Sequence, residues 1–120
     1  MLEQLDVVVV GGGPGGLSAA LAAASAGARV TLIDAYSQQG GQYYRQPPER
    51  MLKQSNSHQR AGQQLIQRVR EAGVRIVPDT LVASVSADRT LMCVGPNGSY
   101  LAQARAVIIA SVSVTKAERG

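Results

Sequence analysis

A run of six residues, Gly11 to Gly16, reads Gly-Gly-Gly-Pro-Gly-Gly and constrains the fold more than any other segment. Before it stands the β-branched run Val7–Val10, which suits a strand buried on both faces of a parallel sheet. After it, apolar residues recur at helical spacing from Leu17 to Ala24. A second short β-branched run, Arg29–Ile33, then ends on Asp34. We therefore expect a strand, a turn, a helix and a parallel strand, joined by a right-handed crossover.

Three glycines of this turn, Gly11, Gly13 and Gly16, have the spacing G-x-G-x-x-G. In this motif the first glycine permits a tight turn, the second lets the backbone approach a pyrophosphate, and the third lets the helix pack closely on the strand. The pyrophosphate lies at a helix N-terminus, where free N–H groups and the helix dipole favour an anion. Asp34 follows Gly16 by 18 residues, and a carboxylate there accepts hydrogen bonds from ribose hydroxyls. The turn, its flanking elements and the acid predict an adenine-dinucleotide site.

The chain after Asp34 continues with a long polar segment, a helix and a strand. Between Tyr36 and His58 neither a helical nor a strand period is visible, and loops of this length are usually functional or disordered. Apolar residues at helical spacing predict a helix from about Arg60 to Ala72, which Gly73 would end. A third short strand is expected at Val74–Val77.

Short apolar runs separated by turn residues predict an antiparallel β-meander at about residues 80–105. Its strands are expected at Leu81–Val85, Thr90–Val94 and Tyr100–Ala104. The next run, Ala106–Ala110, is continuously apolar and is expected to return to the buried parallel sheet. The sequence thus predicts an α/β, Rossmann-like dinucleotide-binding fold with a parallel sheet, flanking helices and an antiparallel meander near the C-terminus. Residues 1–120 suit a single domain.

Composition narrows the classes of partner. The four aromatic residues are all Tyr, and stacking platforms for nucleic acid need several exposed rings. Residues 45–75 carry seven basic and two acidic side chains, and no nucleic-acid motif accompanies them. We expect this basic run to be a solvated face, or else a surface for a partner or a phosphate. The apolar run Val7–Val10, preceded by Glu3 and Asp6, predicts neither a secretory signal nor a membrane span and favours the cytoplasm.

No group of side chains predicts a catalytic or metal centre. His58, the single histidine, lies in a polar stretch where a solvated side chain is expected. Cys93, the single cysteine, excludes an internal disulfide and is expected to be a small buried residue of a strand. NAD and FAD share the glycine fingerprint, so NAD(P) stays open as an alternative. The long segment after Asp34 and the meander both depart from an ordinary NAD fold and favour FAD.

The segment Gln39–Pro48 reads Gln-Gly-Gly-Gln-Tyr-Tyr-Arg-Gln-Pro-Pro. Together with the glycine turn and Asp34, it resembles the FAD domain of the two-dinucleotide-fold flavoprotein oxidoreductases. The resemblance covers residues 5–110 and is greatest to the flavin-binding subunits of opine oxidase, hydrogen cyanide synthase and related amine-oxidising complexes.

The resemblance implies further contacts with the cofactor. Gly40, Gly41 and Gln42 would line the flavin, and the backbone of Val82 would face the adenine. Where the family has Ala-Thr-Gly beside the cofactor, this chain has Ala110, Ser111 and Val112. The full set of expected FAD-contacting residues is Gly11, Gly13, Pro14, Gly15, Gly16, Asp34, Ala35, Gly40, Gly41, Gln42, Val82, Ala110 and Ser111.

The function that the resemblance implies is oxidation of C–N bonds in an amine, amino-acid or opine-type substrate by an FAD-dependent oxidoreductase. Family chains are longer, with an NAD-type domain and a returning FAD segment. We therefore expect this chain to act with a partner subunit or as a homo-oligomer rather than alone. The alternatives are a non-catalytic nucleotide-binding module and a fragment of an NAD-dependent dehydrogenase.

Overall fold

The computed structural model of the chain describes residues 2–36 and 52–110. Its helices are α1 (Pro14–Ser25) and α2 (Leu52–Glu71). Its strands are β1 (Glu3–Val10), β2 (Val30–Ile33), β3 (Arg75–Val77), β4 (Leu81–Val85), β5 (Thr90–Gly95) and β6 (Gly98–Ile109). The strands form one sheet in the order β3-β2-β1-β6-β5-β4.

One half of the sheet is parallel and the other is antiparallel. Strands β3, β2, β1 and β6 run parallel to one another, and Val7–Val10 of β1 pairs with β2 on one side and with β6 on the other. Strands β4, β5 and the first part of β6 form the antiparallel meander. This arrangement confirms the expected α/β fold.

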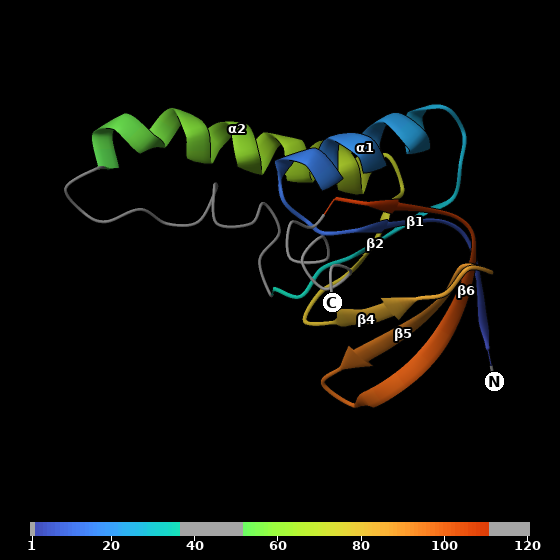
Figure 1. Ribbon diagram of the computed structural model, residues 1–120. Helices are drawn as coiled ribbons and strands as arrows, with labels where there is room; N and C mark the ends of the chain where they lie inside the picture. Colours follow the sequence, from blue (N-terminus) through green and yellow to red (C-terminus); the bar gives the residue numbers. More distant parts are fainter. Residues whose placement is uncertain (1, 37–51, 111–120) are drawn as a thin grey trace.

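The molecule has three layers, which Figure 1 shows from the side. Helices α1 and α2 cover one face of the parallel strands, where Val9, Leu32 and Leu17 are fully buried between helix and sheet. The meander covers the opposite face, where Val8 of β1 packs in the same cluster as Cys93 of β5. Successive valines of β1 therefore enter two different cores, which explains why this strand is apolar at every position from Val7 to Val10.

Two helix ends agree with the expected stop signals. Gly27 and Gly73 follow α1 and α2 and have φ angles of +99° and +89°. Glycine adopts this left-handed conformation without a steric penalty.

Neither helix in residues 2–36 and 52–110 combines the length and hydropathy that a membrane span requires.

The start of α2 differs from the expectation. We expected no regular structure up to His58, whereas α2 already begins at Leu52. An apolar stripe reveals only the part of a helix that packs on a core, and residues 53–59, which are all polar, carry no such stripe. Once the packed part of α2 is nucleated, adding turns of polar residues has a low cost because propagation forms one hydrogen bond per residue.

The end of the sheet also differs. The sequence predicted separate strands at Tyr100–Ala104 and Ala106–Ala110, whereas β6 is one strand from Gly98 to Ile109. Its first part pairs with β5 and its whole second half pairs with β1, so one strand serves both halves of the sheet. The predicted run Ala106–Ala110 is in the parallel part of the sheet as expected, but it is not buried, because Ile108 and Ile109 are 39% and 45% exposed.

Candidate nucleotide-binding site

The glycine turn lies at the carboxyl ends of the parallel strands and leads directly into α1. Gly11 has a φ angle of +110°, a conformation that disfavours any side chain. Its N–H donates to the carbonyl of Ile33 at 2.8 Å, which ties the start of the turn to the end of β2. The carboxyl ends of parallel strands are where ligands bind in open α/β sheets.

The N-terminus of α1 presents backbone donors to this edge. Gly13 is the N-cap, no side chain caps the helix, and Pro14 follows in the first turn. The helical ladder begins with the N–H of Leu17, which donates to the carbonyl of Gly13 at 2.9 Å. The N–H groups of Gly15 and Gly16 precede that first bond, so they have no acceptor within the helix. Two N–H groups and the positive end of a helix dipole make this position suited to an anion.

The glycines differ in what surrounds them. No protein atom of the described residues lies within 4 Å of a Cβ built on Gly13 or on Gly15. A Cβ on Gly16, in contrast, would overlap the backbone carbonyl oxygen of Gly11 and approach Ala110 Cβ to 3.5 Å. Gly16 therefore allows α1 to approach the preceding strand, whereas Gly13 and Gly15 leave open space. This division matches the roles expected of the second and third glycines of the motif.

Asp34 is held beside the glycine turn. It is only 4% exposed, and a Cβ on Gly12 would overlap its Oδ2 atom and lie 2.7 Å from its Cγ. Its backbone N–H donates to the carbonyl of Val77 at 2.9 Å, and its own carbonyl accepts the N–H of Thr80 at 2.9 Å. The end of β3 and the residues after it thus fix the backbone that carries the acid.

Two residues of this arrangement were missed in the sequence. Gly12 is the second of the three consecutive glycines Gly11–Gly13. Because it has no side chain, the side chain of Asp34 can pack directly against the turn. Thr80 is 3% exposed, and its hydroxyl donates to the carbonyl of Pro78 at 3.0 Å. Because Pro78 directly follows the third predicted strand, the turn there could have been placed at the same edge as Asp34.

The remaining predicted positions separate into three groups. Ala110 follows β6 and donates its N–H to the carbonyl of Val10 at 2.8 Å, so it lies at the glycine turn. Ala35 is exposed directly after Asp34, and Val82 of β4 packs against the core between meander and sheet. Predicted contacts at Gly40, Gly41, Gln42 and Ser111 lie outside the described residues.

Cys93 has the environment of a structural thiol. It is fully buried in β5, opposite Tyr100 of β6. Burial raises the pKa of the Cys93 thiol, and it also raises the pKa of the Tyr100 hydroxyl. A thiol with a raised pKa stays protonated at neutral pH and is a poor nucleophile. In residues 2–36 and 52–110, no three His, Cys, Asp or Glu side chains gather as a metal site would need.

Comparison with known families gives one match. The sequence model of the family described as FAD dependent oxidoreductase matches residues 6–114. A search of curated protein sequences gave no match.

Solved structures with a similar fold include several larger proteins. The chain aligns with p-nitrophenol 4-monooxygenase PnpA from Pseudomonas putida DLL-E4 at 20% identity and a TM-score of 0.72, over 90% of this chain and 41% of that one. L-Proline dehydrogenase from P. horikoshii gives 22% identity and a TM-score of 0.70, over 92% and 23% of the two chains. THI4 of Thermovibrio ammonificans gives 17% and 0.72, over 97% and 62%. These likenesses show a shared fold, and this chain spans less than two-thirds of each relative.

Proposed function

Because this chain belongs to the FAD dependent oxidoreductase family, we propose that its glycine turn and Asp34 bind the adenosine diphosphate half of FAD. The glycine motif is compatible with both NAD(P) and FAD, and membership of this family indicates FAD. The observation that carries the proposal is the open space at Gly13, which lies beside the free N–H groups of α1 while Asp34 is buried across the turn. When bound, FAD supplies the electron-accepting flavin.

Each part of the site has a distinct task in this proposal. The N–H groups of Gly15 and Gly16 donate to the pyrophosphate, and the missing side chain of Gly13 lets the phosphates approach the backbone. The carboxylate of Asp34 accepts hydrogen bonds from the ribose hydroxyls. Ala35, the next residue in the chain, also contacts the adenosine in this proposal. Gly12 keeps this carboxylate close to the turn, because any larger residue would displace it.

The flavin half of the cofactor would contact residues farther along the chain. We assign the flavin surroundings to Gly40, Gly41 and Gln42, with the Ala110–Ser111 backbone beside the cofactor and the Val82 backbone facing the adenine. The position of Ala110 at the end of β6, next to Gly16, supports its part of this assignment.

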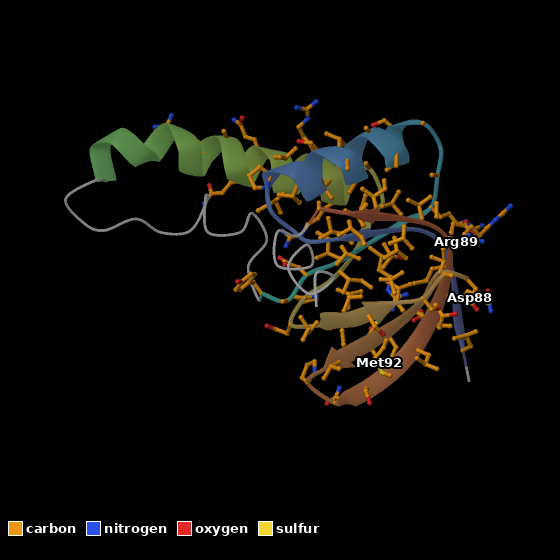
Figure 2. The ribbon with its side chains drawn as sticks, in the orientation of Figure 1. Asp88, Arg89 and Met92 are labelled. Carbon is orange, nitrogen blue, oxygen red and sulfur yellow. The ribbon has the colours of Figure 1, made fainter. Side chains whose placement is uncertain are left out.

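An Asp34→Ala variant is expected to bind ADP about tenfold to a hundredfold more weakly than the parent chain. The variant loses charge-assisted hydrogen bonds to ribose, each of which contributes about 1.5–3 kcal/mol. Isothermal titration with ADP measures the change. Asp88→Ala is the matched control, because it removes the same charge from the exposed turn before β5, labelled in Figure 2. Equal ADP affinity in the Asp34→Ala and parent chains would show that Asp34 does not bind the ribose.

We further propose that the substrate is an amine, amino acid or opine whose C–N bond is oxidised. The support is the resemblance of the Gln39–Pro48 segment to the flavin subunits of opine oxidase and hydrogen cyanide synthase. One structural relative is named an L-proline dehydrogenase, whose name gives an amino acid as its substrate, and another is named a monooxygenase. The fold alone therefore leaves the substrate class open, and this part of the proposal depends on the segment.

An anaerobic reduction assay tests the substrate class. The FAD-loaded protein is mixed with an opine, and bleaching of the flavin absorbance is followed; the control is the matching compound in which an ether oxygen replaces the amine nitrogen. We expect the opine to bleach the flavin at least about tenfold faster than the ether, since the nitrogen lone pair assists loss of hydride from the adjacent carbon. Flavin that binds but is bleached by neither compound would support the alternative of a non-catalytic nucleotide-binding module.

We also propose that the protein works with a partner subunit or as a homo-oligomer. The support is the resemblance of the Gln39–Pro48 segment to flavin-binding subunits, which belong to amine-oxidising complexes. Ordering of the site by association would lower the entropic cost of binding FAD. FAD affinity should therefore rise with protein concentration, and an affinity independent of concentration would contradict this part of the proposal.

A further inference from the structure

The residues that follow β2 are held against one turn at the carboxyl edge of the sheet. The carbonyl of Asp34 accepts the N–H of Thr80 at 2.9 Å, and the carbonyl of Tyr36 accepts the N–H of Asp79 at 3.2 Å. Two carbonyls of one short segment are thus bonded to adjacent N–H groups of another. The protein itself therefore fixes the backbone from Asp34 to Tyr36.

The turn that holds this segment has a specified conformation. Asp79 has a φ angle of +55°, in the left-handed region that Asp adopts more readily than most residues. Thr80 is 3% exposed, and its hydroxyl donates to the carbonyl of Pro78 at 3.0 Å. Sparsely populated backbone conformations persist only where their surroundings determine them, and they cluster at functional sites. The turn Pro78–Thr80 is thus a support for the segment that carries Asp34 and Tyr36.

Tyr36 brings an aromatic ring close to Asp34. Its side chain is 45% exposed, whereas Asp34 is 4% exposed. The Cα atoms of the two residues lie at most about 7.6 Å apart, because consecutive Cα atoms are 3.80 Å apart. Tyr100, the other tyrosine in residues 2–36 and 52–110, lies in the meander on β6. Among the described residues, the ring of Tyr36 is therefore the one available beside the acid.

The order of these groups along the chain matches the order of groups in ADP. The glycine turn is tied to the end of β2 by the bond from the Gly11 N–H to the Ile33 carbonyl, and Asp34 and Tyr36 follow Ile33. In ADP the pyrophosphate is followed by the ribose and then by the base. With the phosphates at the glycine turn and the ribose on Asp34, the base lies within one sugar width of Asp34.

We propose that Tyr36 is a positioning residue whose ring stacks on the adenine of the bound cofactor. This inference rests on the proposed function, in which Asp34 binds the ribose. An aromatic ring stacks on the face of a base, whereas backbone groups such as those of Val82 bond its edge, so the two contacts are compatible. Because the turn Pro78–Thr80 already holds the Tyr36 backbone, little backbone freedom is lost on binding.

Calorimetric titration with ADP tests the inference. Tyr36→Ala is expected to bind ADP about fivefold to a hundredfold more weakly than the parent chain, which is the range for loss of one stacked base. Tyr36→Phe keeps the ring and should bind as the parent does, whereas Tyr36→Leu keeps apolar bulk without a ring and should be weakened. Tyr100→Ala, the matched control, removes a similarly exposed ring from the meander and should bind normally. Thermal unfolding checks that each variant is folded.

The proton resonances of the adenine give an independent readout. A ring stacked on the base shifts the H2 and H8 signals of ADP upfield, so we expect this shift with the parent chain and with Tyr36→Phe but not with Tyr36→Ala. If Tyr36→Ala bound ADP with the parent affinity, or if Tyr36→Phe lost as much affinity as Tyr36→Ala, stacking by Tyr36 would be excluded and the proposed function would stand. A folded parent chain that does not bind ADP would instead contradict the proposed function, and the role of Tyr36 with it.

Discussion

A Gly13→Val variant is expected to bind ADP and FAD at least about a hundredfold more weakly than the parent chain while keeping its fold. Gly13 has φ −76° and ψ −173°, which is extended backbone that valine adopts readily. Because no described protein atom lies within 4 Å of a Cβ at this position, the valine methyl groups enter only the space proposed for the pyrophosphate. Losing that approach removes several charge-assisted hydrogen bonds at once.

Titration calorimetry and thermal unfolding together measure this result. The matched control is Ala22→Val, which places the same side chain on the exposed face of α1, away from the turn. We expect this control to bind ADP normally. A folded Gly13→Val variant with the affinity of the parent chain would show that the phosphates do not approach the turn.

A Gly16→Ala variant is expected to lose stability, with a free energy of unfolding lower by about 1–3 kcal/mol or more. The added Cβ would overlap the carbonyl oxygen of Gly11, which belongs to the backbone, so α1 must shift away from the strand. Helix propensity acts in the opposite direction, since alanine is better than glycine in a helix by about 1 kcal/mol. A net loss would therefore show that packing outweighs propensity.

Gly15→Ala is the matched control for this experiment. Gly15 lies in the same first turn of α1, but it is exposed and has no described protein atom within 4 Å of a built Cβ. Urea unfolding should find this variant as stable as the parent chain or slightly more stable. If Gly16→Ala matched Gly15→Ala in stability, close packing of α1 on the turn would not be the reason for the third glycine.

The features predicted correctly from the sequence are those whose cause is local. Val7–Val10 is apolar at every position because both faces of β1 are covered, and the glycine spacing reports a turn that no other residue type forms as easily. The meander could be expected because Asp88-Arg89 and Pro96-Asn97 interrupt short apolar runs, and turns do lie at both places.

The features that were missed depend on contacts between distant segments. The sequence predicts two strands where β6 is one, because its pattern changes where its neighbours among the described residues change, from β5 and β1 to β1 alone. The contact of Gly12 with Asp34 and the burial of Thr80 both arise where three chain segments meet at one edge of the sheet. The periodicity of apolar residues in a sequence does not reveal contacts between segments that are far apart in the chain.

We propose above that the glycine turn and Asp34 hold the adenosine diphosphate half of FAD. The most direct test is calorimetric titration of the parent chain with ADP and, separately, with FMN, because ADP carries the adenosine and pyrophosphate whereas FMN carries the flavin and one phosphate. We expect ADP to bind, FMN to bind at least about tenfold more weakly, and Gly13→Val to abolish the ADP signal. Binding of FMN without binding of ADP, or an ADP signal unchanged in Gly13→Val, would contradict it.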